Sequence, residues 1–437
     1  MAYLLNTTLQ QDEMLKVLGL SSLEELYKDF PNELKIKGLN IPKGIGEQAV
    51  LRKFTEFASK NTVYPTIFRG AGAYRHYIPA VVPEMVNKER FKTAYTPYQA
   101  EVSQGVLQSI FEFQSMICEL TGLDVSNASV YDGATAAAEA SAMCKERKRE
   151  RTLILENVNP LIIDTVNTYS WAADSPVDII SAKDGLTDIE ALQKALKSTD
   201  DVASVLVQQP NYFGLIEDIA AIAEVCHAAK AKLIVSINPI ASAVLASMGE
   251  CGVDIVVGEG QPLGIPLSFG GPYLGFMAAT NALMRRMPGR IAGQTTDEQG
   301  RRAFVLTLQA REQHIRRETA GSNICSNQAL CAITAACYMA SMGSAGMTDV
   351  ATLCYNKAHH LANELVNIGF ELKYDGDFFH EFITTCPVDV NNLMQKLEGD
   401  GILGGLPLKD GSILWCATEM NTKDEIEKLV SIIKEVK

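Results

Sequence analysis

Paired cysteine motifs, a basic leader and long apolar runs are all missing from this sequence of 437 residues. No two of its ten cysteines form a CxxC pair, so we expect reduced thiols and neither disulfides nor a metal site. The first fifteen residues carry no Lys or Arg, which argues against a secretory signal peptide. No apolar run approaches the roughly 20 residues that cross a membrane. These absences predict a cytoplasmic protein without a membrane-spanning segment.

Positive charge is scarce as well. The chain carries 39 Lys and Arg against 52 Asp and Glu, which gives a formal net charge of -13. Such a field repels polyanions, so nucleic acid is not an expected partner. Hydrophobic residues make up 47% and charged residues 21% of the chain, which is typical of a folded globular protein rather than a disordered one. At this length we expect more than one domain.

The order of apolar and polar residues predicts three regions. Residues 1–95 contain short helical stretches broken by Gly and Pro, which we interpret as an N-terminal arm without a core of its own. Residues 96–330 are expected to form a large α/β domain, and residues 331–437 a smaller C-terminal α+β domain. The large domain opens with an amphipathic pattern from Pro97 to about Thr121, which predicts a helix that ends at Gly122.

Strands and helices then alternate along the chain. Short β-branched apolar runs predict strands at 153–155, 177–180, 205–207, 233–237 and 254–257, and helical windows lie near them at 133–148, 160–172, 187–197, 217–230 and 239–249. This alternation predicts a mostly parallel sheet covered on both faces by helices. In the C-terminal region, the pattern predicts helices near 350–368 and 390–398, strands at 381–384 and 413–417, and a final helix.

Lysine is absent between Lys232 and Lys357. This absence matters because a large α/β domain with a C-terminal α+β domain suits many functions, among them those of pyridoxal-phosphate enzymes. Such an enzyme needs a lysine for the Schiff base, an acid beside the pyridinium nitrogen, and backbone N–H groups at a helix N-terminus for the phosphate. The lysine is expected on the turn after strand 254–257. There the chain has Gln261, whose amide cannot form an imine.

The other two requirements are met only in part. The phosphate position falls at residues 129–135, where a run of small residues opens a helix at Gly133. Asp132 precedes it and suits an N-cap, so its carboxylate would satisfy the N–H groups and repel a phosphate dianion. The acid is expected after strand 233–237, where Asn238 stands and no Asp or Glu occurs before Glu250. The chain alone is therefore not predicted to be a pyridoxal-phosphate enzyme.

Three long segments resemble the N-terminal half of the glycine cleavage system P-protein. Two of them cover residues 253–278 and 287–330, and the third covers 94–140 and begins Ala94-Tyr95-Thr96-Pro97-Tyr98-Gln99. Motifs of this length are far more specific than a short glycine pattern. In that family, the protein is one long chain with two similar halves or a pair of separate subunits. The second half, or second subunit, carries the lysine in an HKT-type motif.

The resemblance implies a role for this chain within a complex. Gln261 falls at the place of the lysine when Ile265-Pro266 and residues 270–272 are laid on the motif of the second half. Because the chain has one half only, it resembles the separate-subunit form, whose lysine-bearing (beta) partner would hold pyridoxal phosphate covalently. The resemblance also implies pyridoxal-phosphate fold type I and a heterodimer or dimer of heterodimers. That glycine dehydrogenase (decarboxylating) would decarboxylate glycine and pass the aminomethyl group to the lipoyl group of H-protein.

The same resemblance implies candidates for lining the active site of the partner, which in this fold type lies at a dimer interface. They fall in two loops, at Tyr95, Thr96, Tyr98 and Gln99, and at Gly270, Gly271 and Pro272. Each of the two loops also has a purely structural interpretation. Tyr and Pro before a helix often serve as a staple and as the first helical residue, and the glycines suit a plain turn. The Gly-rich residues 69–76 are a further candidate, for a segment that closes the tunnel to that active site.

Arginine gathers in one stretch, at Arg301, Arg302, Arg311, Arg316 and Arg317. These side chains could face the acidic H-protein or a carboxylate. Interleaved Glu312 and Glu318 favour internal salt bridges instead, and His314 among them is expected to be structural.

Two other functions remain open on the sequence alone. The chain could be an assembly module that only stabilises its partner, in which case turnover would survive mutation of Tyr95 and Tyr98 while the complex stays intact. It could also be an independent pyridoxal-phosphate enzyme, such as an aminotransferase or decarboxylase, that uses a remote lysine. Borohydride reduction of an imine on the isolated chain would establish this last alternative, which the lysine-free stretch disfavours.

Overall fold

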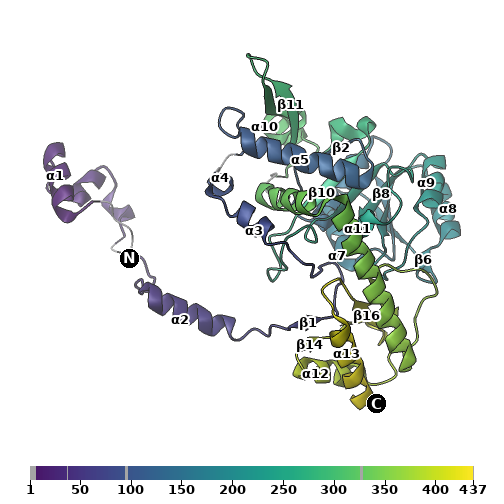
Figure 1. Ribbon diagram of the computed structural model, residues 1–437. Helices are drawn as coiled ribbons and strands as arrows, with labels where there is room; N and C mark the ends of the chain where they lie inside the picture. Colours follow the sequence, from purple (N-terminus) through teal and green to yellow (C-terminus); the bar gives the residue numbers. More distant parts are fainter. Residues whose placement is uncertain (1–5, 37, 94–96, 325–327, 437) are drawn as a thin grey trace. The chain divides into compact units, whose positions relative to one another are not determined.

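The computed structural model describes residues 6–36, 38–93, 97–324 and 328–436. The chain divides into two compact units, Met1–Val63 and Tyr64–Lys437 (Figure 1). The smaller unit contains α1 (Thr8–Leu18), the 3₁₀ turns η1 (Leu23–Tyr27) and η2 (Asn32–Leu34), and α2 (Glu47–Ala58). Thr7 caps α1 by accepting the N–H of Gln10, and left-handed Gly19 ends the helix. None of the described residues of this unit is buried, so they form no hydrophobic core.

A seven-stranded sheet forms the centre of the larger unit, in the order β2-β10-β9-β8-β7-β3-β4. Its strands are β2 (Val125–Ser126), β3 (Arg151–Leu155), β4 (Val177–Ile180), β7 (Val202–Gln209), β8 (Lys232–Ile237), β9 (Ile255–Glu259) and β10 (Gly275–Ala279). Five neighbouring strands, β4, β3, β7, β8 and β9, run parallel to one another, whereas β10 runs antiparallel to β9 and to β2. Consecutive residues of β7, β8 and β9 are buried, so both faces of the sheet are covered. The predicted mostly parallel sheet is confirmed.

Helices pack around this sheet where the sequence pattern placed most of them (Figure 1). They are α5 (Gln104–Thr121), α6 (Gly133–Cys144), α7 (Pro160–Ala172), α8 (Ile189–Ser198) and α9 (Ile219–Ala228), and the short helices α3 (Val81–Val86) and α4 (Glu89–Lys92) precede them in the chain. Four of the five predicted helical windows are confirmed as α6 to α9. One continuous cluster of buried apolar side chains joins helices and sheet, and each Val, Leu or Ile in it contributes about 1.5–3 kcal/mol relative to exposure.

The fifth predicted helix is wrong. Within the window 239–249, the structure has only the 3₁₀ turn η3 (Ala241–Ala243). The Asn238 side chain accepts the N–H groups of Ile240 and Ala241, which closes a tight turn directly after β8. The residues that follow form turns against α5, since the N–H of Gly249 donates to Thr121 at the end of that helix.

The long helix α5 ends at left-handed Gly122 as predicted, but it begins at Gln104 and not at Pro97. The carbonyl of Gln99 accepts the N–H of Ser103 at 2.9 Å, which folds the preceding residues into turns. The side chain of Gln104 also donates to and accepts from the backbone of β12 (Arg302–Thr307), which fixes the first turn of the helix there.

Short elements lie outside the central sheet. They are the hairpin of β5 (Ala182–Lys183) and β6 (Leu186–Thr187), the hairpin of β11 (Ile291–Thr296) and β12, η4 (Asn281–Arg286), η5 (Gln309–Arg311), α10 (Gln313–Arg316) and η6 (Arg317–Thr319). The β11–β12 hairpin extends from the larger unit beside α10 (Figure 1).

The C-terminal region packs around a three-stranded antiparallel sheet, β13-β16-β15. Its elements are α11 (Ala329–Asn367), β13 (Glu381–Thr384), α12 (Val390–Gly399), β14 (Ile402–Leu403), β15 (Leu406–Pro407), β16 (Ile413–Cys416) and α13 (Lys423–Val436). Trp415 and Phe382 are buried in its own hydrophobic cluster. The predicted elements of this region are confirmed, except that the helix expected near 350–368 begins much earlier, at Ala329.

By length and composition alone, α11 is apolar enough to cross a membrane. A single such helix is weak evidence, because the core helix of a soluble protein passes the same test. The backbone of Gly343 leaves the helical region with a φ of 62°, so two helical segments meet there. Buried side chains of both segments, such as Tyr338 and Leu361, pack into the two hydrophobic clusters.

The segment that starts at Tyr64 packs on the C-terminal region. The short strand β1 (Thr66–Ile67) pairs in parallel with β14, and Phe68 is fully buried in the C-terminal cluster. The larger unit therefore starts at Tyr64, whereas the sequence pattern extended the arm to residue 95. The boundary between a large and a small domain near residue 330 stays a prediction.

Candidate functional site

Gln261 stands on the turn after β9, where a Schiff-base lysine is expected. The residue is buried, with 2% of its surface exposed. Its amide oxygen accepts the N–H of Tyr74 at 2.9 Å, and its amide nitrogen donates to the carbonyls of Tyr74 at 2.9 Å and Ile265 at 2.8 Å. Both N–H groups of the amide are thus used, and the side chain fastens the segment 70–74 to this turn.

Glu259, two residues earlier, places its carboxylate at the N-terminus of α6. One oxygen accepts the N–H of Gly133 at 3.0 Å, and the other accepts the N–H groups of Gln261 at 3.0 Å and Leu274 at 3.1 Å. A phosphate would need such donors, since the free N–H groups of a helix N-terminus bind anions. The carboxylate therefore takes the place of a phosphate. Burial raises the pKa of this carboxyl to about 7, although the three N–H donors act to lower it.

Asp132 is the N-cap of α6, as its position in the sequence predicts. Its carboxylate accepts the N–H of Thr135 at 2.8 Å, and the Thr135 hydroxyl accepts the N–H of Asp132 at 3.1 Å, which makes a reciprocal capping box. Gly133 packs so closely on β9 that a Cβ atom there would lie 2.8 Å from the backbone nitrogen of Glu259. Asp132 and the ionised form of Glu259 therefore place negative charge at this helix N-terminus, which opposes a phosphate dianion.

Asn238 follows β8, at the position where an acid beside a pyridinium nitrogen is expected. Its oxygen is occupied by the N–H groups of Ile240 at 2.9 Å and Ala241 at 3.2 Å. Its nitrogen lies 3.4 Å from Nε2 of His380, a ring whose burial lowers its pKa well below the usual value and keeps it neutral. Asn238 supplies an amide and not a carboxylate, so it cannot stabilise a protonated ring nitrogen by charge.

A cavity of about 400 Å³ remains among these residues, and its lining includes Asp132, Gly133, Asn238, Glu259 and residues 70–74. The segment 70–74, which we call the strap, forms one wall. Glu381 holds the strap in place, because one of its oxygens accepts the N–H of Ala71 at 2.6 Å and the other accepts the hydroxyl of Tyr74 at 2.7 Å. Burial raises the pKa of Glu381 to about 7.

The residues around this cavity do not fit pyridoxal phosphate. Gln261 cannot form a Schiff base, Glu259 occupies the first N–H of α6 at the expected phosphate position, and Asn238 carries no charge. Sequence reasoning placed Gln261, Asp132 and Asn238 but missed Glu259. A signal was present, because Glu259 directly ends an apolar strand and stands two residues before the turn position that a lysine would take.

The family model of the glycine cleavage system P-protein matches residues 1–433. Two relatives named probable glycine dehydrogenase (decarboxylating) subunit 1 match over 443 residues, with 99% of each chain covered. The relative from Moorella thermoacetica is 46% identical, and the relative from Carboxydothermus hydrogenoformans is 47% identical. The chain belongs to the glycine cleavage system P-protein family. Because it spans the full length of relatives numbered subunit 1, it is confirmed as an N-terminal-type subunit of the two-subunit P-protein.

Solved structures give the same family and fold. A crystal structure of glycine decarboxylase (P-protein) of the glycine cleavage system, in inhibitor-bound form, matches this P-protein chain with a TM-score of 0.93 and 37% identity, covering 100% of both. An alanine–glyoxylate aminotransferase from Nostoc sp. shares the fold with a TM-score of 0.60 and 16% identity, over 92% of this chain and 98% of that one. The predicted pyridoxal-phosphate fold type I is confirmed.

The first predicted interface loop of this P-protein subunit is described only in part. Tyr95 and Thr96 lie outside the described residues, while Tyr98 and Gln99 are described. The guanidinium carbon of Arg290 lies 4.1 Å from the centroid of the Tyr98 ring, and Gln99 is exposed. Neither Tyr98 nor Gln99 lines the cavity beside Gln261, so their contact with the partner's active site stays a prediction.

The second predicted loop joins the Gln261 turn to β10 and contains Gly270, Gly271 and Pro272. Four consecutive residues, 268–271, have a positive φ, a conformation that glycine adopts at the least cost. Phe269 in this run is 89% exposed. The loop thus holds a large aromatic side chain away from the core of the subunit. Its predicted place at the interface with a partner also stays a prediction.

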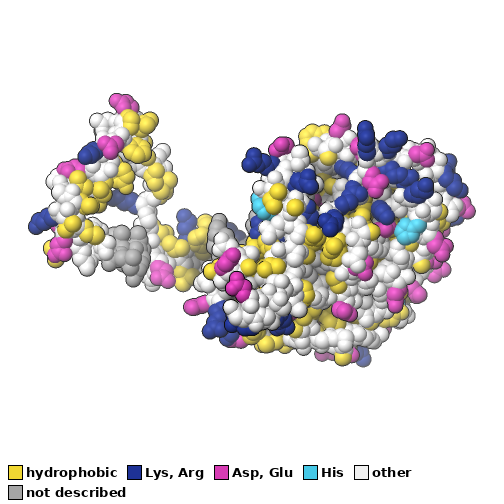
Figure 2. All heavy atoms as spheres, turned by 90° about the horizontal axis from the view of Figure 1, so that it is seen from above, with side chains coloured by type: hydrophobic (Ala, Val, Ile, Leu, Met, Phe, Trp, Pro, Cys, Tyr) yellow, Lys and Arg dark blue, Asp and Glu magenta, His cyan; other side chains and the backbone are white. Residues whose placement is uncertain are grey.

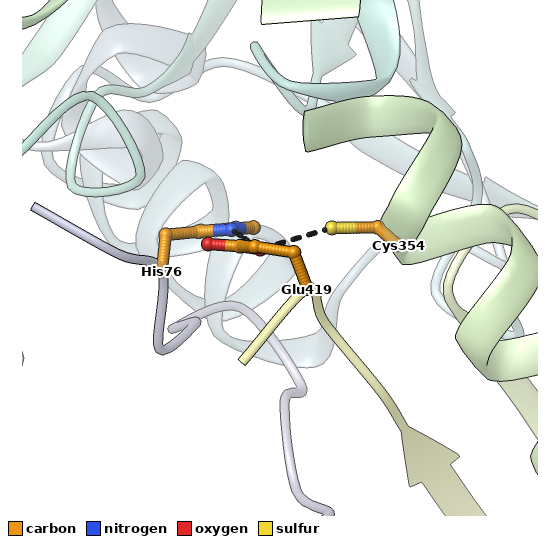
Figure 3. Close-up of side chains that lie close together, drawn as sticks. All are labelled: His76, Cys354 and Glu419. Carbon is orange, nitrogen blue, oxygen red and sulfur yellow. Dashed lines mark hydrogen bonds and ion pairs between the residues drawn. The ribbon is translucent and has the colours of Figure 1, made fainter. Parts of the chain in front are cut away.

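A buried cluster of His76, Cys354 and Glu419 was missed from the sequence (Figure 3). Nδ1 of His76 lies 2.8 Å from one oxygen of Glu419, and the Cys354 thiol donates to the same oxygen at 3.2 Å. Both contacts run to the carboxylate, so the imidazole is not placed to take the thiol proton, and burial raises the pKa of the thiol well above its usual range. The cluster therefore links three segments: the residues just after the strap, α11, and the segment after β16. It supplies no nucleophile.

The donor atoms of this cluster lie within 4.8 Å of one another. Hydrogen bonds already engage the carboxylate, the thiol and one ring nitrogen. The prediction that the chain holds no metal stays a prediction.

Proposed function

We propose that this chain is the subunit of a two-subunit glycine dehydrogenase (decarboxylating) that lacks the Schiff-base lysine, and that the second subunit carries pyridoxal phosphate covalently. The observation that carries the proposal is the pairing of buried Gln261, on the turn after β9, with Glu259 at the end of that strand. Gln261 stands where the lysine is expected, and Glu259 accepts the first N–H of α6, at the helix N-terminus where the phosphate is expected. The family membership and the printed names of the relatives, which number them subunit 1, imply a second subunit.

The expected partners follow from the family. They are the lysine-bearing, C-terminal-type (beta) P-protein subunit, glycine, and lipoylated H-protein. The complex would decarboxylate glycine and transfer the aminomethyl group to the lipoyl group of H-protein. When bound, the cofactor would supply the electron sink for loss of carbon dioxide. No residue of this chain is assigned a covalent step.

This subunit would contribute surface to the active site of its partner. Two described parts support that role: the loop around Tyr98, whose ring packs on Arg290, and the exposed loop at residues 268–272 with Phe269. An aromatic side chain exposed to this extent is a common anchor in protein interfaces. The cytoplasmic location and the absence of a nucleic-acid partner remain predictions from the sequence.

An absorbance spectrum after addition of pyridoxal phosphate tests the proposal. The band of protein-bound cofactor is expected only when this chain is mixed with its lysine-bearing partner, or on that partner alone, and never on this chain alone. Borohydride reduction followed by peptide mass mapping locates the modified lysine. A specific, saturable adduct on a lysine of this chain would contradict the proposal and support an independent enzyme.

A pure assembly module is the alternative that needs a separate test. Replacement of Tyr98 by Phe and by Ala distinguishes the two, with complex formation measured by sedimentation. If the loop lines the partner's site, Tyr98→Ala lowers turnover in a complex that still forms. Unchanged turnover in the intact complex would favour the module.

A further inference from the structure

A second cavity, of about 500 Å³, lies beside the C-terminal half of α6, between residues 285–290 and residues 311–324. Basic side chains dominate its lining, and they are Lys145, Arg285, Arg286, Arg290, Arg311 and Arg316. Glu312 is the one carboxylate among the described lining residues. The end of the larger unit with β11 and α10, uppermost in Figure 1, faces the viewer in Figure 2, and Lys and Arg side chains are prominent there. This is an unusual concentration in a chain with a net charge of -13.

Internal carboxylates neutralise only part of this charge. Glu312 pairs with Arg290 at 3.5 Å and also lies 3.6 Å from Nδ1 of His314. Glu146 pairs with Arg286 at 3.4 Å. The other four cations of the lining form no ion pair within the described part of the chain, and they are Lys145, Arg285, Arg311 and Arg316. The sequence favours salt bridges from Arg311 and Arg316 to Glu312 or Glu318, but among the described residues neither arginine forms one, and Glu312 pairs with Arg290 instead.

Arg311 has the geometry of an oxyanion ligand. Its Nη1 donates to the carbonyl of Met287, whereas its Nε and Nη2 are shielded from solvent and have no hydrogen-bond partner among the described residues. Nε and Nη2 form one edge of the guanidinium, the edge that donates two parallel hydrogen bonds to a carboxylate or phosphate. Buried donors without partners are costly, so this edge favours an acceptor with two oxygens.

We propose that this basic cavity binds the oxyanion group of a small molecule, a phosphate or a carboxylate, with Arg311 as its bidentate donor. The volume lies within the range of small-molecule sites, about 300–1,000 Å³. A small molecule is favoured over an acidic protein surface because the unpartnered edge of Arg311 is buried, where a small anion can reach it. Carboxylates on a docking protein would instead contact Arg285 and Arg316, which are exposed at the rim. The proposal does not depend on the proposed function, since it rests on the lining of this chain alone.

Calorimetric titration of the full chain with inorganic pyrophosphate and, separately, with citrate tests the proposal at constant ionic strength. One saturable site with a dissociation constant below about 1 mM is expected for at least one probe, and the stronger probe identifies the source as phosphate or carboxylate. Arg311→Lys keeps the charge but loses the two-donor edge, so affinity should fall by at least about tenfold. Arg301→Lys is the matched control, because Arg301 is exposed and pairs with Asp297 outside the cavity, so the affinity of this variant should be unchanged.

A second variant keeps the test decisive if Arg311→Lys fails to fold. Arg285 and Arg316 are exposed at the rim, so the double change Arg285→Gln with Arg316→Gln should leave folding intact and weaken binding at least about threefold. The absence of saturable binding of either probe would overturn the proposal, as would equal affinity in wild type and the double variant. Binding of poly-glutamate in the absence of binding by both small anions would also overturn it, and would mark the face as a protein-docking surface.

Discussion

Glu259 ends β9 and Gln261 stands on the turn that follows, and each uses its side-chain polar atoms to satisfy buried backbone groups. Because Glu259 keeps the helix N-terminus occupied, Gln261→Lys alone is expected to give no pyridoxal-phosphate adduct that borohydride can fix. The change also removes the hydrogen bonds to Tyr74 and Ile265, which should lower the free energy of unfolding by about 1–3 kcal/mol. Mass spectrometry after reduction checks the first result, and urea denaturation checks the second.

The lysine-bearing subunit, reduced in parallel, is the positive control for that experiment. An adduct on Gln261→Lys in comparable yield would mean that the cavity is intact as a cofactor site apart from its lysine.

Glu259 also predicts a pH dependence of stability. Burial raises its pKa from the ordinary 4.5 to about 7, so the folded chain binds a proton more tightly than the unfolded chain. Its stabilising contribution is therefore fully present below pH 4.5 and is lost as the pH rises through about 7. In Glu259→Gln this dependence is absent. The amide has one acceptor oxygen fewer, which costs stability at every pH. The difference from wild type should nevertheless shift in favour of the variant, by up to about 3 kcal/mol, between about pH 5 and pH 8. Urea denaturation at intervals across that range measures the difference. A difference that is constant with pH would contradict this account of Glu259.

The site residues that could be predicted from the sequence are those whose positions follow from the order of strands and helices along the chain. Gln261 and Asn238 each follow a strand, and Asp132 precedes a helix, so strand ends and helix starts were enough to find them. Glu259 and Tyr74 act through distant partners, since Tyr74 meets Gln261 across 187 residues. His76 and Glu419 are separated by 343 residues, and no local pattern indicates that they meet.

At the scale of elements, the cluster of His76, Cys354 and Glu419 joins three segments that are distant in sequence. Glu419→Ala leaves buried donors without an acceptor and should lower the free energy of unfolding by about 3 kcal/mol at neutral pH. Burial acts to raise the pKa of Glu419, but hydrogen bonds from His76, the Tyr77 N–H and Cys354 lower it overall. The contribution of Glu419 is thus present above its ordinary pKa of 4.5 and is lost as the pH falls through the lower folded value.

Urea denaturation at neutral and acidic pH measures both effects. Glu427→Ala is the control, because Glu427 is an exposed residue of α13 paired with Lys423 at 3.5 Å, and it should change stability by less than about 0.5 kcal/mol. Equal effects of the two changes would show that the cluster does not join these elements.

The loop at residues 268–272 predicts an effect on association and not on folding. Phe269 is 89% exposed, so Phe269→Ser should leave the free energy of unfolding within about 0.5 kcal/mol of wild type. As an interface anchor, its loss should weaken binding of the lysine-bearing subunit by roughly 30-fold, which corresponds to about 2 kcal/mol. Sedimentation or calorimetric titration gives the affinity. Trp171→Ser, on α7, is the comparison, since Trp171 is 82% exposed and should not change it. An unchanged affinity in Phe269→Ser would exclude the loop from the interface.

Element types were predicted well from the sequence because hydrophobic periodicity reflects burial on one or both faces. β7 to β9 are apolar over most of their length and lie in the covered centre of the sheet. The errors fall where side-chain contacts override periodicity. Asn238 closes a turn where a helix was expected, and Gln104 fixes the later start of α5. The early start of α11 at Ala329 was missed because its first segment is mostly small and apolar, without a clear polar face.

At the scale of the whole molecule, the larger unit combines a complete fold type I architecture with a cavity whose groups do not suit the cofactor of that fold. An acidic chain also carries a basic cavity with an unpaired arginine edge. Both features are consistent with a subunit that acts beside a partner. The family, the fold and the missing lysine were available from the sequence, whereas the replacement of the phosphate by Glu259 required the three-dimensional structure.

Reconstitution shows whether this chain is needed for glycine decarboxylation without holding the cofactor. Glycine–bicarbonate exchange is measured for this chain, for the lysine-bearing subunit, and for mixtures in increasing ratio, each with pyridoxal phosphate. We expect no exchange by this chain alone, and activity in the mixtures that rises until the two subunits are equimolar. Exchange in a preparation of this chain free of its partner would show that it holds the cofactor itself, and full activity of the lysine-bearing subunit alone would show that this chain is not needed.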